Sequence, residues 1–229
     1  MVRAVLFDLF GTVIAYDQVE EGTYQAWAGV HRVAQRLGLQ MDYEPFAAEW
    51  QRQFESRLAP EDDRDASVFV GKIMRLFRSL GLPEDREAAD EAATACLAAW
   101  GAHVSVPADA VPTLEALHHR CRLALVTNFD HPPFVYEIMA QRGLAGRFDA
   151  VVVSGELRID KPDPRIFWHA LEAVQVAPED ALMVGDSVSA DIEGAHAAGC
   201  QAVLIDRLGW HPEYAGPRIH CLSDLLALT

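Results

Sequence analysis

Five short apolar runs in this chain alternate with segments of helical periodicity, and this alternation constrains the fold more than any other feature. The runs are almost continuous in apolar residues and show no alternation with polar ones. Strands buried on both faces of a parallel sheet have this composition. We expect strands at residues 2–7, 122–127, 150–154, 181–185 and 202–205, and helices at 110–118, 132–142, 164–174 and 189–198. The sequence therefore predicts the α/β class with a doubly wound parallel sheet.

Residues 16–105 do not show this alternation. The segment contains no convincing strand, and its apolar residues recur at helical spacing in four successive stretches. Glycine, proline and charged residues separate these stretches at Gly38–Leu39, Ala59–Asp65 and Gly81–Glu84. Short loops make consecutive helices antiparallel neighbours, so we predict a helical bundle inserted after the first strand. The predicted domains are a core of residues 1–15 and 106–229 and a helical domain of residues 16–105.

Composition excludes some classes of function. With 229 residues, of which 51% are hydrophobic, the chain can bury a sizeable core. Its formal net charge of −15 argues against a nucleic-acid or membrane partner, because the 19 lysines and arginines are spread through the sequence. No targeting or membrane-spanning pattern is present, so we expect a cytoplasmic protein. Its widely spaced cysteines are expected to be reduced thiols: Cys96, Cys121, Cys200 and Cys221.

Polar residues that could take part in catalysis or ligand binding follow the predicted strands. Ligands of open parallel sheets bind outside the carboxyl ends of the strands, so we expect these side chains to converge there. Asp8 is a candidate nucleophile, Thr127 a hydroxyl donor to an anionic oxygen, and Lys161 a cation that neutralises the bound group. Each also has an ordinary structural interpretation, since Lys161 stands in a turn before a proline. The set that follows the strands is Asp8, Thr127, Asn128, Lys161, Asp186 and Asp191.

Three of these residues are aspartates, which would repel one another without a cation. Carboxylate oxygens suit a hard ion, and magnesium combines few carboxylates with waters and a substrate phosphate. We therefore predict a Mg²⁺ site that includes Asp8, Asp186 and Asp191. For Asp191 the alternative is a favourable charge at a helix N-terminus.

The segments DLFGTV, VTN, KPDPRIF and GDSVSADIEGA, in this order and spacing, resemble the four motifs of the haloacid dehalogenase-like (HAD) hydrolase superfamily. The resemblance covers essentially the whole chain. It implies a Rossmann-like core with an inserted α-helical bundle as a cap that closes over the cleft and selects the substrate. It also implies that Asp8 is the nucleophile and that the backbone carbonyl of Phe10 joins Asp8, Asp186 and Asp191 as a magnesium ligand. Thr127 and Lys161 would grip the transferred group, and Thr12 and Asn128 are further substrate-binding candidates.

The chain departs from the family pattern at Phe10. Family phosphatases have a second aspartate there, which protonates the leaving group, whereas the family's dehalogenases have an aromatic residue. GDSVSAD favours the magnesium-dependent members instead, because it retains both acidic residues. Dehalogenases also use a halide-binding arginine, for which Arg32 and Arg36 are candidates only by proximity. They further tend to have a tyrosine shortly after the lysine, where this chain has Phe167.

Asp130 and His131 are candidates to replace the missing proton donor, because they follow Asn128 at the same sheet edge. The structural alternative is a turn and helix start, with Asp130 near the N-cap and Pro132 or Pro133 in the first turn. Trp210 and His211 could rim the cleft, although a packed terminal segment is the expectation we prefer.

Three functions follow from this pattern. The first is magnesium-dependent hydrolysis of a small phosphorylated metabolite through an aspartyl-phosphate, with a leaving group that needs little protonation. The second is a 2-haloacid dehalogenase. The third is a weakly active or non-catalytic phosphate-binding protein. The sequence specifies neither the substrate nor the oligomeric state.

Overall fold

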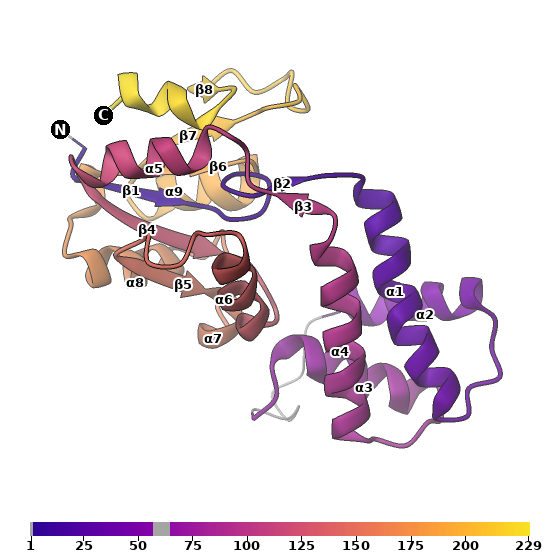
Figure 1. The fold of residues 1–229 in the computed structure, drawn as a ribbon. Helices are drawn as coiled ribbons and strands as arrows, with labels where there is room; N and C mark the ends of the chain where they lie inside the picture. The colour runs from indigo at the N-terminus through magenta and orange to yellow at the C-terminus, as the bar shows by residue number, and fades with distance from the viewer. Residues whose placement is uncertain (1, 57–64) are drawn as a thin grey trace. The chain divides into compact units, whose positions relative to one another are not determined.

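The computed structural model describes residues 2–56 and 65–229 (Figure 1). The chain divides into two compact units. The first, which we call the core unit, comprises Met1–Tyr16 and Ser105–Thr229, and the second, the helical unit, comprises Asp17–Val104. A short two-stranded sheet of β2 (Ala15–Tyr16) and β3 (Val104–Ser105) forms where the chain passes from one unit to the other.

The core unit contains a parallel sheet in the order β5-β4-β1-β6-β7-β8, which confirms the predicted fold class. The strands are β1 (Ala4–Phe7), β4 (Arg122–Thr127), β5 (Ala150–Val153), β6 (Ala181–Gly185), β7 (Gln201–Ile205) and β8 (Arg218–Ile219). Sequence analysis found the first five and missed β8, because two residues in a glycine- and proline-rich tail carry no periodicity. β1 lies in the middle of the sheet, between β4 and β6, so the chain reverses its direction of winding beside it.

Helices cover both faces of this sheet (Figure 1). They are α5 (Ala110–His118), α6 (Pro132–Gln141), α7 (Ser154–Leu157), α8 (Pro164–Val174), α9 (Gly194–Ala197) and the short turns η1 (Pro178–Asp180), η2 (Val188–Glu193) and η3 (Leu222–Ala227). The helix expected at 189–198 is in fact a π-helical turn, η2, followed by α9. A π-helical turn is rare and is often found at functional sites.

The two covered faces explain the continuous apolar runs. Ala4 and Leu6 of β1 belong to one buried cluster with side chains of α8 and α9. Successive side chains of a strand point to opposite faces, so Val5 and Phe7 face the other side, where α5 packs against β4 and η3. Every residue of β1 is buried, as the absence of polar alternation predicts.

The described part of the helical unit contains four helices: α1 (Val19–Arg36), α2 (Tyr43–Glu55), α3 (Val68–Ser79) and α4 (Arg86–Gly101). The Ser67 side chain caps α3 by accepting the N–H of Val70, and Asp85 caps α4 in the same way. Aromatic side chains such as Trp50 and Phe69 form the interior, with ring centroids 5.8 Å apart. The expected break at Ala59–Asp65 lies outside the described residues apart from Asp65.

The cysteines are free thiols, as expected, and Cys96 and Cys200 are buried while Cys121 and Cys221 are half-buried. In the described ranges no helix has the length and apolar character needed to span a bilayer.

Candidate active site

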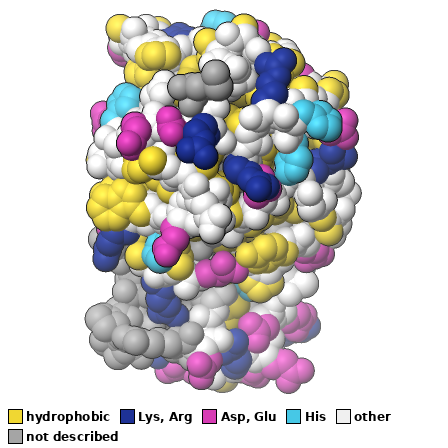
Figure 2. Space-filling model, turned by 90° about the vertical axis from the view of Figure 1, so that its left-hand side faces the viewer, with side chains coloured by type: hydrophobic (Ala, Val, Ile, Leu, Met, Phe, Trp, Pro, Cys, Tyr) yellow, Lys and Arg dark blue, Asp and Glu magenta, His cyan; other side chains and the backbone are white. Residues whose placement is uncertain are grey.

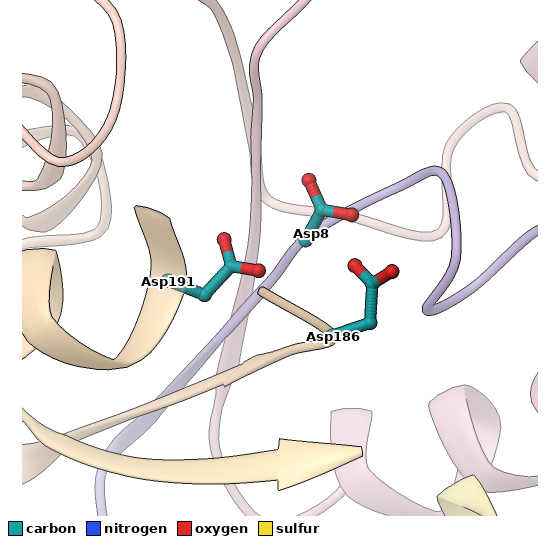
Figure 3. A group of neighbouring side chains, drawn as sticks. All are labelled: Asp8, Asp186 and Asp191. Carbon is teal, nitrogen blue, oxygen red and sulfur yellow. The ribbon is translucent and has the colours of Figure 1, made fainter. Parts of the chain in front are cut away.

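Three carboxylates meet at the carboxyl end of the sheet. Asp8, Asp186 and Asp191 each present an oxygen to the same small volume, and these oxygens lie within 4.8 Å of one another (Figure 3). Asp8 and Asp191 are 7% and 1% exposed, so their charges are largely removed from water. Buried carboxylates this close together are stable only with compensating cations or protons.

The topology of the sheet accounts for this convergence. Asp8 follows β1 and Asp186 follows β6, and these strands are hydrogen-bonded neighbours, with the N–H of Asp8 donating to Val184 O at 2.9 Å. Asp191 comes from η2, where its Oδ2 accepts the N–H of Ser187 at 3.0 Å. The predicted meeting of strand ends therefore occurs for Asp8 and Asp186, and Asp191 joins them from η2.

Two glycines leave room for the carboxylates. Gly11 has a φ of +95°, and a Cβ there would lie 2.1 Å from an Asp186 carboxylate oxygen. A Cβ on Gly185 would lie 2.2 Å from the carboxyl carbon of Asp191. Any side chain at either position would displace a carboxylate, so both glycines are required for the close approach.

Lys161 supplies the positive charge in this cluster. Its ammonium group donates to Asp8 Oδ1 at 2.7 Å, to Asp191 Oδ1 at 2.6 Å and to Val126 O at 2.8 Å. An ammonium has three N–H donors, so each one has a partner. The Lys161 side chain is only 2% exposed, which excludes the interpretation of an ordinary turn lysine.

One cation does not balance three carboxylates, and the pKa values reflect this. Burial raises the pKa of Asp8 from 3.8 to about 7, against the opposing effect of Lys161 and with the help of Asp191 and Asp186. Burial and the Asp191 charge raise the pKa of Asp186 to about 6. Burial alone would lower the pKa of Lys161, but Asp8 and Asp191 hold it above its ordinary range. The site therefore retains a charged lysine and a deficit of positive charge.

This deficit and the ligand chemistry fit a divalent cation. Oxygen ligands from carboxylates are what Mg²⁺ prefers, and a second cation would relieve the repulsion that raises the two aspartate pKa values. The donor set of Asp8, Asp186 and Asp191 can thus hold a hard metal ion. The contribution of the Phe10 carbonyl stays a prediction.

Asn128 positions Lys161. Its side-chain Nδ2 donates to Lys161 O at 2.9 Å, and its Oδ1 accepts the N–H of Lys161 at 2.8 Å. Both polar ends of the amide thus hold the lysine backbone, and direct substrate binding by Asn128 stays a prediction. Thr127, at the end of β4, is 1% exposed. Its role at the transferred group stays a prediction.

Thr12 is fully buried, and its hydroxyl has no hydrogen-bond partner among the described residues. Its backbone carbonyl accepts a hydrogen bond from Arg207 at 3.2 Å, which holds the turn after β1 in place. A buried hydroxyl without a partner is unfavourable unless a ligand satisfies it. Its place in the Gly11–Thr12 turn keeps Thr12 as a substrate-binding candidate.

Phe10 belongs to an aromatic wall that we define as Phe10, Phe129 and Phe134. The ring centroids of Phe10 and Phe129 lie 5.0 Å apart, and those of Phe129 and Phe134 lie 5.6 Å apart in a stacked arrangement. Phe10 is 8% exposed, so the residue is packed. The position of the usual second aspartate is thus apolar and offers no proton.

Other predicted residues have different surroundings. Arg36 pairs with Glu91 inside the helical unit, with one N–H···O distance of 2.8 Å, and Phe167 is buried in the core cluster. His131, rather than Asp130, occupies the N-cap of α6, without a side-chain cap hydrogen bond, and Pro132 starts the helix as expected.

Our expectation that Trp210 belongs to a packed terminal segment is wrong, because this residue is 64% exposed. The Asp206 carboxylate accepts its backbone N–H at 2.8 Å, so the loop is ordered without burying the ring.

Two further residues act on the carboxylates: sequence reasoning missed Tyr16, whereas it named His211 as a residue that could rim the cleft. Burial raises the pKa of the Tyr16 hydroxyl above its usual range, and the charge of Asp8 adds to the effect, so Tyr16 stays protonated. His211 is close enough for its charge to lower the pKa of Asp186. Neither residue lies in one of the four motifs, and only the folded chain brings them to the carboxylates.

Several known proteins resemble this chain in sequence or in fold. A family model described as haloacid dehalogenase-like hydrolase matches residues 2–199. The N-acylneuraminate-9-phosphatase of Rattus norvegicus is 30% identical over 99% of this chain and 92% of its own length. The phosphoserine phosphatase of Thermus thermophilus is 48% identical over a shorter region, 43% of this chain and 39% of its own length. The crystal structure of a 2-haloacid dehalogenase from Pseudomonas syringae superposes with a TM-score of 0.76, at 25% identity and with 100% and 98% of the two chains covered.

Proposed function

Because the chain belongs to the haloacid dehalogenase-like hydrolases, we propose that it is a magnesium-dependent hydrolase of a small phosphorylated metabolite, with Asp8 as the nucleophile. One observation supports this most directly: Lys161 bridges Asp8 and Asp191 while Asp186 completes a carboxylate cluster within 4.8 Å. A dehalogenase needs no such cluster, whereas attack of a carboxylate on an anionic phosphate needs nearby positive charge.

In this proposal Asp8 attacks the phosphorus atom. The bond from the phosphorus to an Asp8 oxygen forms as the bond to the leaving oxygen breaks, and an aspartyl-phosphate results. Water then attacks the phosphorus, releases inorganic phosphate and restores Asp8. Lys161 holds Asp8 in position for attack and, with Thr127, balances charge on the transferred group.

Magnesium, held by Asp8, Asp186, Asp191 and the carbonyl of Phe10, would neutralise the charge of the phosphate. The helical unit would act as the cap that selects the substrate and excludes water. Thr12 would donate its unsatisfied hydroxyl to the phosphate.

The apolar wall at Phe10 restricts the leaving group. Without a proton donor at this position the leaving oxygen departs as an anion, so groups of low pKa are favoured. A missing general acid typically lowers the rate by about 10² to 10⁴. Acyl phosphates and aryl phosphates would lose much less, because their leaving groups have a low pKa and need little protonation. We therefore propose these as the preferred substrates, and Asp130 or His131 remains the candidate for a substitute acid.

The same wall favours one second candidate, a 2-haloacid dehalogenase, in which Asp8 displaces halide from carbon and water hydrolyses the ester. Phe10 is the observation in its favour, together with the similarity to the Pseudomonas syringae enzyme. The carboxylate pair of Asp186 and Asp191 argues against it.

A paired assay separates the two functions. Phosphate release would be measured from aryl and alkyl phosphates with and without magnesium, alongside chloride release from 2-chloropropionate. We expect magnesium-dependent phosphate release that falls as the leaving-group pKa rises, whereas metal-independent chloride release would select the dehalogenase. Neither release, despite magnesium binding, would select the non-catalytic phosphate-binding protein.

The metal site can be tested in the same assay. Asp186→Asn should raise the magnesium concentration needed for half-maximal activity by about 10- to 100-fold. Asp90→Asn, on an exposed face of α4, is the matched control and should leave it unchanged. Asp130→Asn should lower activity on alkyl phosphates only if Asp130 is the substitute acid.

A further inference from the structure

A cavity of about 330 Å³ lies at the opposite end of the sheet, where the strands begin. This volume is at the lower limit of small-molecule sites. Figure 2 looks onto this end of the core unit, where basic and histidine side chains gather. The cavity is lined by Arg3, His118, His119, Arg120, Cys121, Arg122 and Asp149.

The lining of this cavity is positively charged, whereas the chain as a whole is negatively charged. Three guanidinium groups face one carboxylate, that of Asp149, although the formal net charge of the protein is −15. Asp149 is already engaged: its oxygens accept Arg122 Nη1 and the N–H of Leu123, both at 2.8 Å. These bonds hold the pKa of Asp149 below its ordinary range despite its partial burial. The lining therefore keeps a surplus of positive charge.

Most guanidinium donors in the cavity have no partner within the described chain. Arg122 uses one nitrogen for Asp149, and Arg120 donates once, to Leu226 O at 3.2 Å. Arg3 forms an ion pair with Asp180, with 3.7 Å between Nη1 and Oδ2, a distance longer than a hydrogen bond. Each guanidinium has five N–H donors. Several donors thus remain available to a ligand with many acceptor oxygens.

Backbone hydrogen bonds fix the segments that carry these side chains. The N–H of Arg3 donates to Asp180 O at 2.7 Å, and Arg3 O accepts the N–H of Arg122 at 2.9 Å. The N–H groups of Arg120 and Cys121 donate to Leu117 O at 2.8 and 3.0 Å. These bonds also occupy a carbonyl at the C-terminus of α5, which reduces the partial negative charge that this helix end presents to an anion.

A second cavity of about 190 Å³ shares His118 and His119 with the first. It adds Arg147, which donates to Glu115 and to Gly143 O, both at 2.7 Å. Each histidine ring has at least one N–H donor. The two cavities therefore flank a histidine pair and can hold a group larger than a single phosphate.

We propose that this cavity binds a small phosphorylated anion, separately from the candidate active site. Phosphate oxygens match the fork of a guanidinium, and a phosphoryl group can accept from several guanidiniums at once, whereas a single carboxylate has only two oxygens. Arg3 and Asp8 are five residues apart along β1, which is about 16 Å at the rise of a strand. A ligand the size of the cavity cannot reach both ends of the sheet, so this is a second site.

The test uses the full chain in a metal-chelating buffer. Pyrophosphate is titrated while the backbone amide resonances of residues 118–122 and of residues 8–12 are followed by NMR. We expect the amides of residues 118–122 to shift with a dissociation constant of about 1 mM or tighter. Shifts confined to residues 8–12 would overturn the proposal.

Variants identify the donors. Arg3→Ala/Arg120→Ala should weaken pyrophosphate binding at residues 118–122 by about tenfold or more. Arg86→Ala, an exposed arginine of α4, is the matched control and should leave the affinity unchanged. Equal affinity in the double variant and in the control would overturn the proposal, and the wild-type titration decides the question if the double variant does not fold.

Further ligands identify the chemical class. Glucose 6-phosphate and inorganic phosphate distinguish a phosphorylated metabolite from free phosphate, and tighter binding of either supports the proposal. Succinate tests charge alone, and equal affinity for succinate would overturn the assignment to phosphate. Tighter binding of a polyglutamate peptide would overturn it in favour of an acidic protein partner.

Discussion

The two ends of the sheet hold positively charged side chains in very different surroundings. At the carboxyl end, Lys161 is 2% exposed and all three of its donors are used by neighbours. At the other end, the side chain of Arg122 is 64% exposed, and one of its nitrogens bonds to Asp149. Charges in water interact weakly and exchange partners easily, whereas buried charges depend on each partner. The comparison predicts a large penalty for mutations at one end and a small one at the other.

The largest expected effect is that of Lys161→Met. In a chelating buffer at pH 7.5 the variant leaves three carboxylates without their cation, so the free energy of unfolding should fall by about 3 to 5 kcal/mol. Arg122→Ala breaks an exposed ion pair and should lower it by no more than about 1 kcal/mol. Urea titrations of the two variants and the wild type measure the difference. Similar losses would show that burial does not distinguish the two ends.

Lys161→Met should also lower kcat/KM by about 10²- to 10³-fold, because it removes a preorganised charge from the transferred group. Lys72→Met is a control in the helical unit, where the lysine donates to Phe54 O at 2.6 Å. A comparable loss of activity in Lys72→Met would mean that Lys161 acts through general stability alone.

The pH dependence of stability tests the carboxylate cluster next. The pKa of Asp8 is about 7 in the folded protein against 3.8 in the unfolded chain. Between these values the unfolded chain ionises Asp8 while the folded protein keeps it protonated. The contribution of Asp8 to stability is therefore fully present below pH 4 and is lost as the pH rises to about 7. The asparagine of Asp8→Asn cannot ionise, so the free energy of unfolding of this variant should gain about 4 kcal/mol relative to the wild type across this range, at about 1.4 kcal/mol for each pH unit between the two pKa values.

Urea titrations at pH 4, 5.5 and 7.5 in a chelating buffer measure this gain. Magnesium at saturating concentration should reduce it, because the cation favours the ionised form of Asp8 in the wild type. A difference between the two proteins that does not change with pH would contradict the raised pKa of Asp8.

The fold was predictable from the sequence because its main signals are local. Continuous apolar runs identify strands covered on both faces, and five of the six strands of the sheet follow from them. Placing reactive residues at the strand ends then required only the rule that parallel strands end at one edge. The chemical roles of Asp8 and Thr127 stay predictions, since positions alone do not establish them.

What the sequence could not show depends on contacts between distant segments. The hydrogen bond from Arg207 to Thr12 O joins residues 195 positions apart, and the clamp of Asn128 on Lys161 joins residues 33 apart. Arginines that look scattered along the chain, such as Arg3 and Arg122, meet because β1 and β4 are neighbours. Net charge and motif spacing carry no information on such pairs, so the basic cavity was missed.

A smaller effect is expected at the clamp that positions Lys161. Asn128→Ala removes two hydrogen bonds to the backbone of Lys161, at 2.9 and 2.8 Å, and should lower the free energy of unfolding by about 1 to 2 kcal/mol. Lys161 would then be positioned less precisely, which should lower kcat by about tenfold with little change in KM. Steady-state kinetics with an aryl phosphate measure both constants. A higher KM at unchanged kcat would return Asn128 to the role of a substrate ligand.

The smallest expected change in stability is that of Thr12→Val, which replaces a buried hydroxyl by a methyl group of the same shape. The hydroxyl has no partner among the described residues, so its removal should leave the free energy of unfolding unchanged or raise it by up to about 1 kcal/mol. If the hydroxyl donates to the substrate, KM for an aryl phosphate should rise about 3- to 10-fold. Thr113→Val, at a buried threonine of α5, is the control and should leave KM unchanged. A stable Thr12→Val with wild-type KM would remove Thr12 from the substrate site, and the carboxyl end of the sheet would then bind its ligand through charged groups and Thr127 alone.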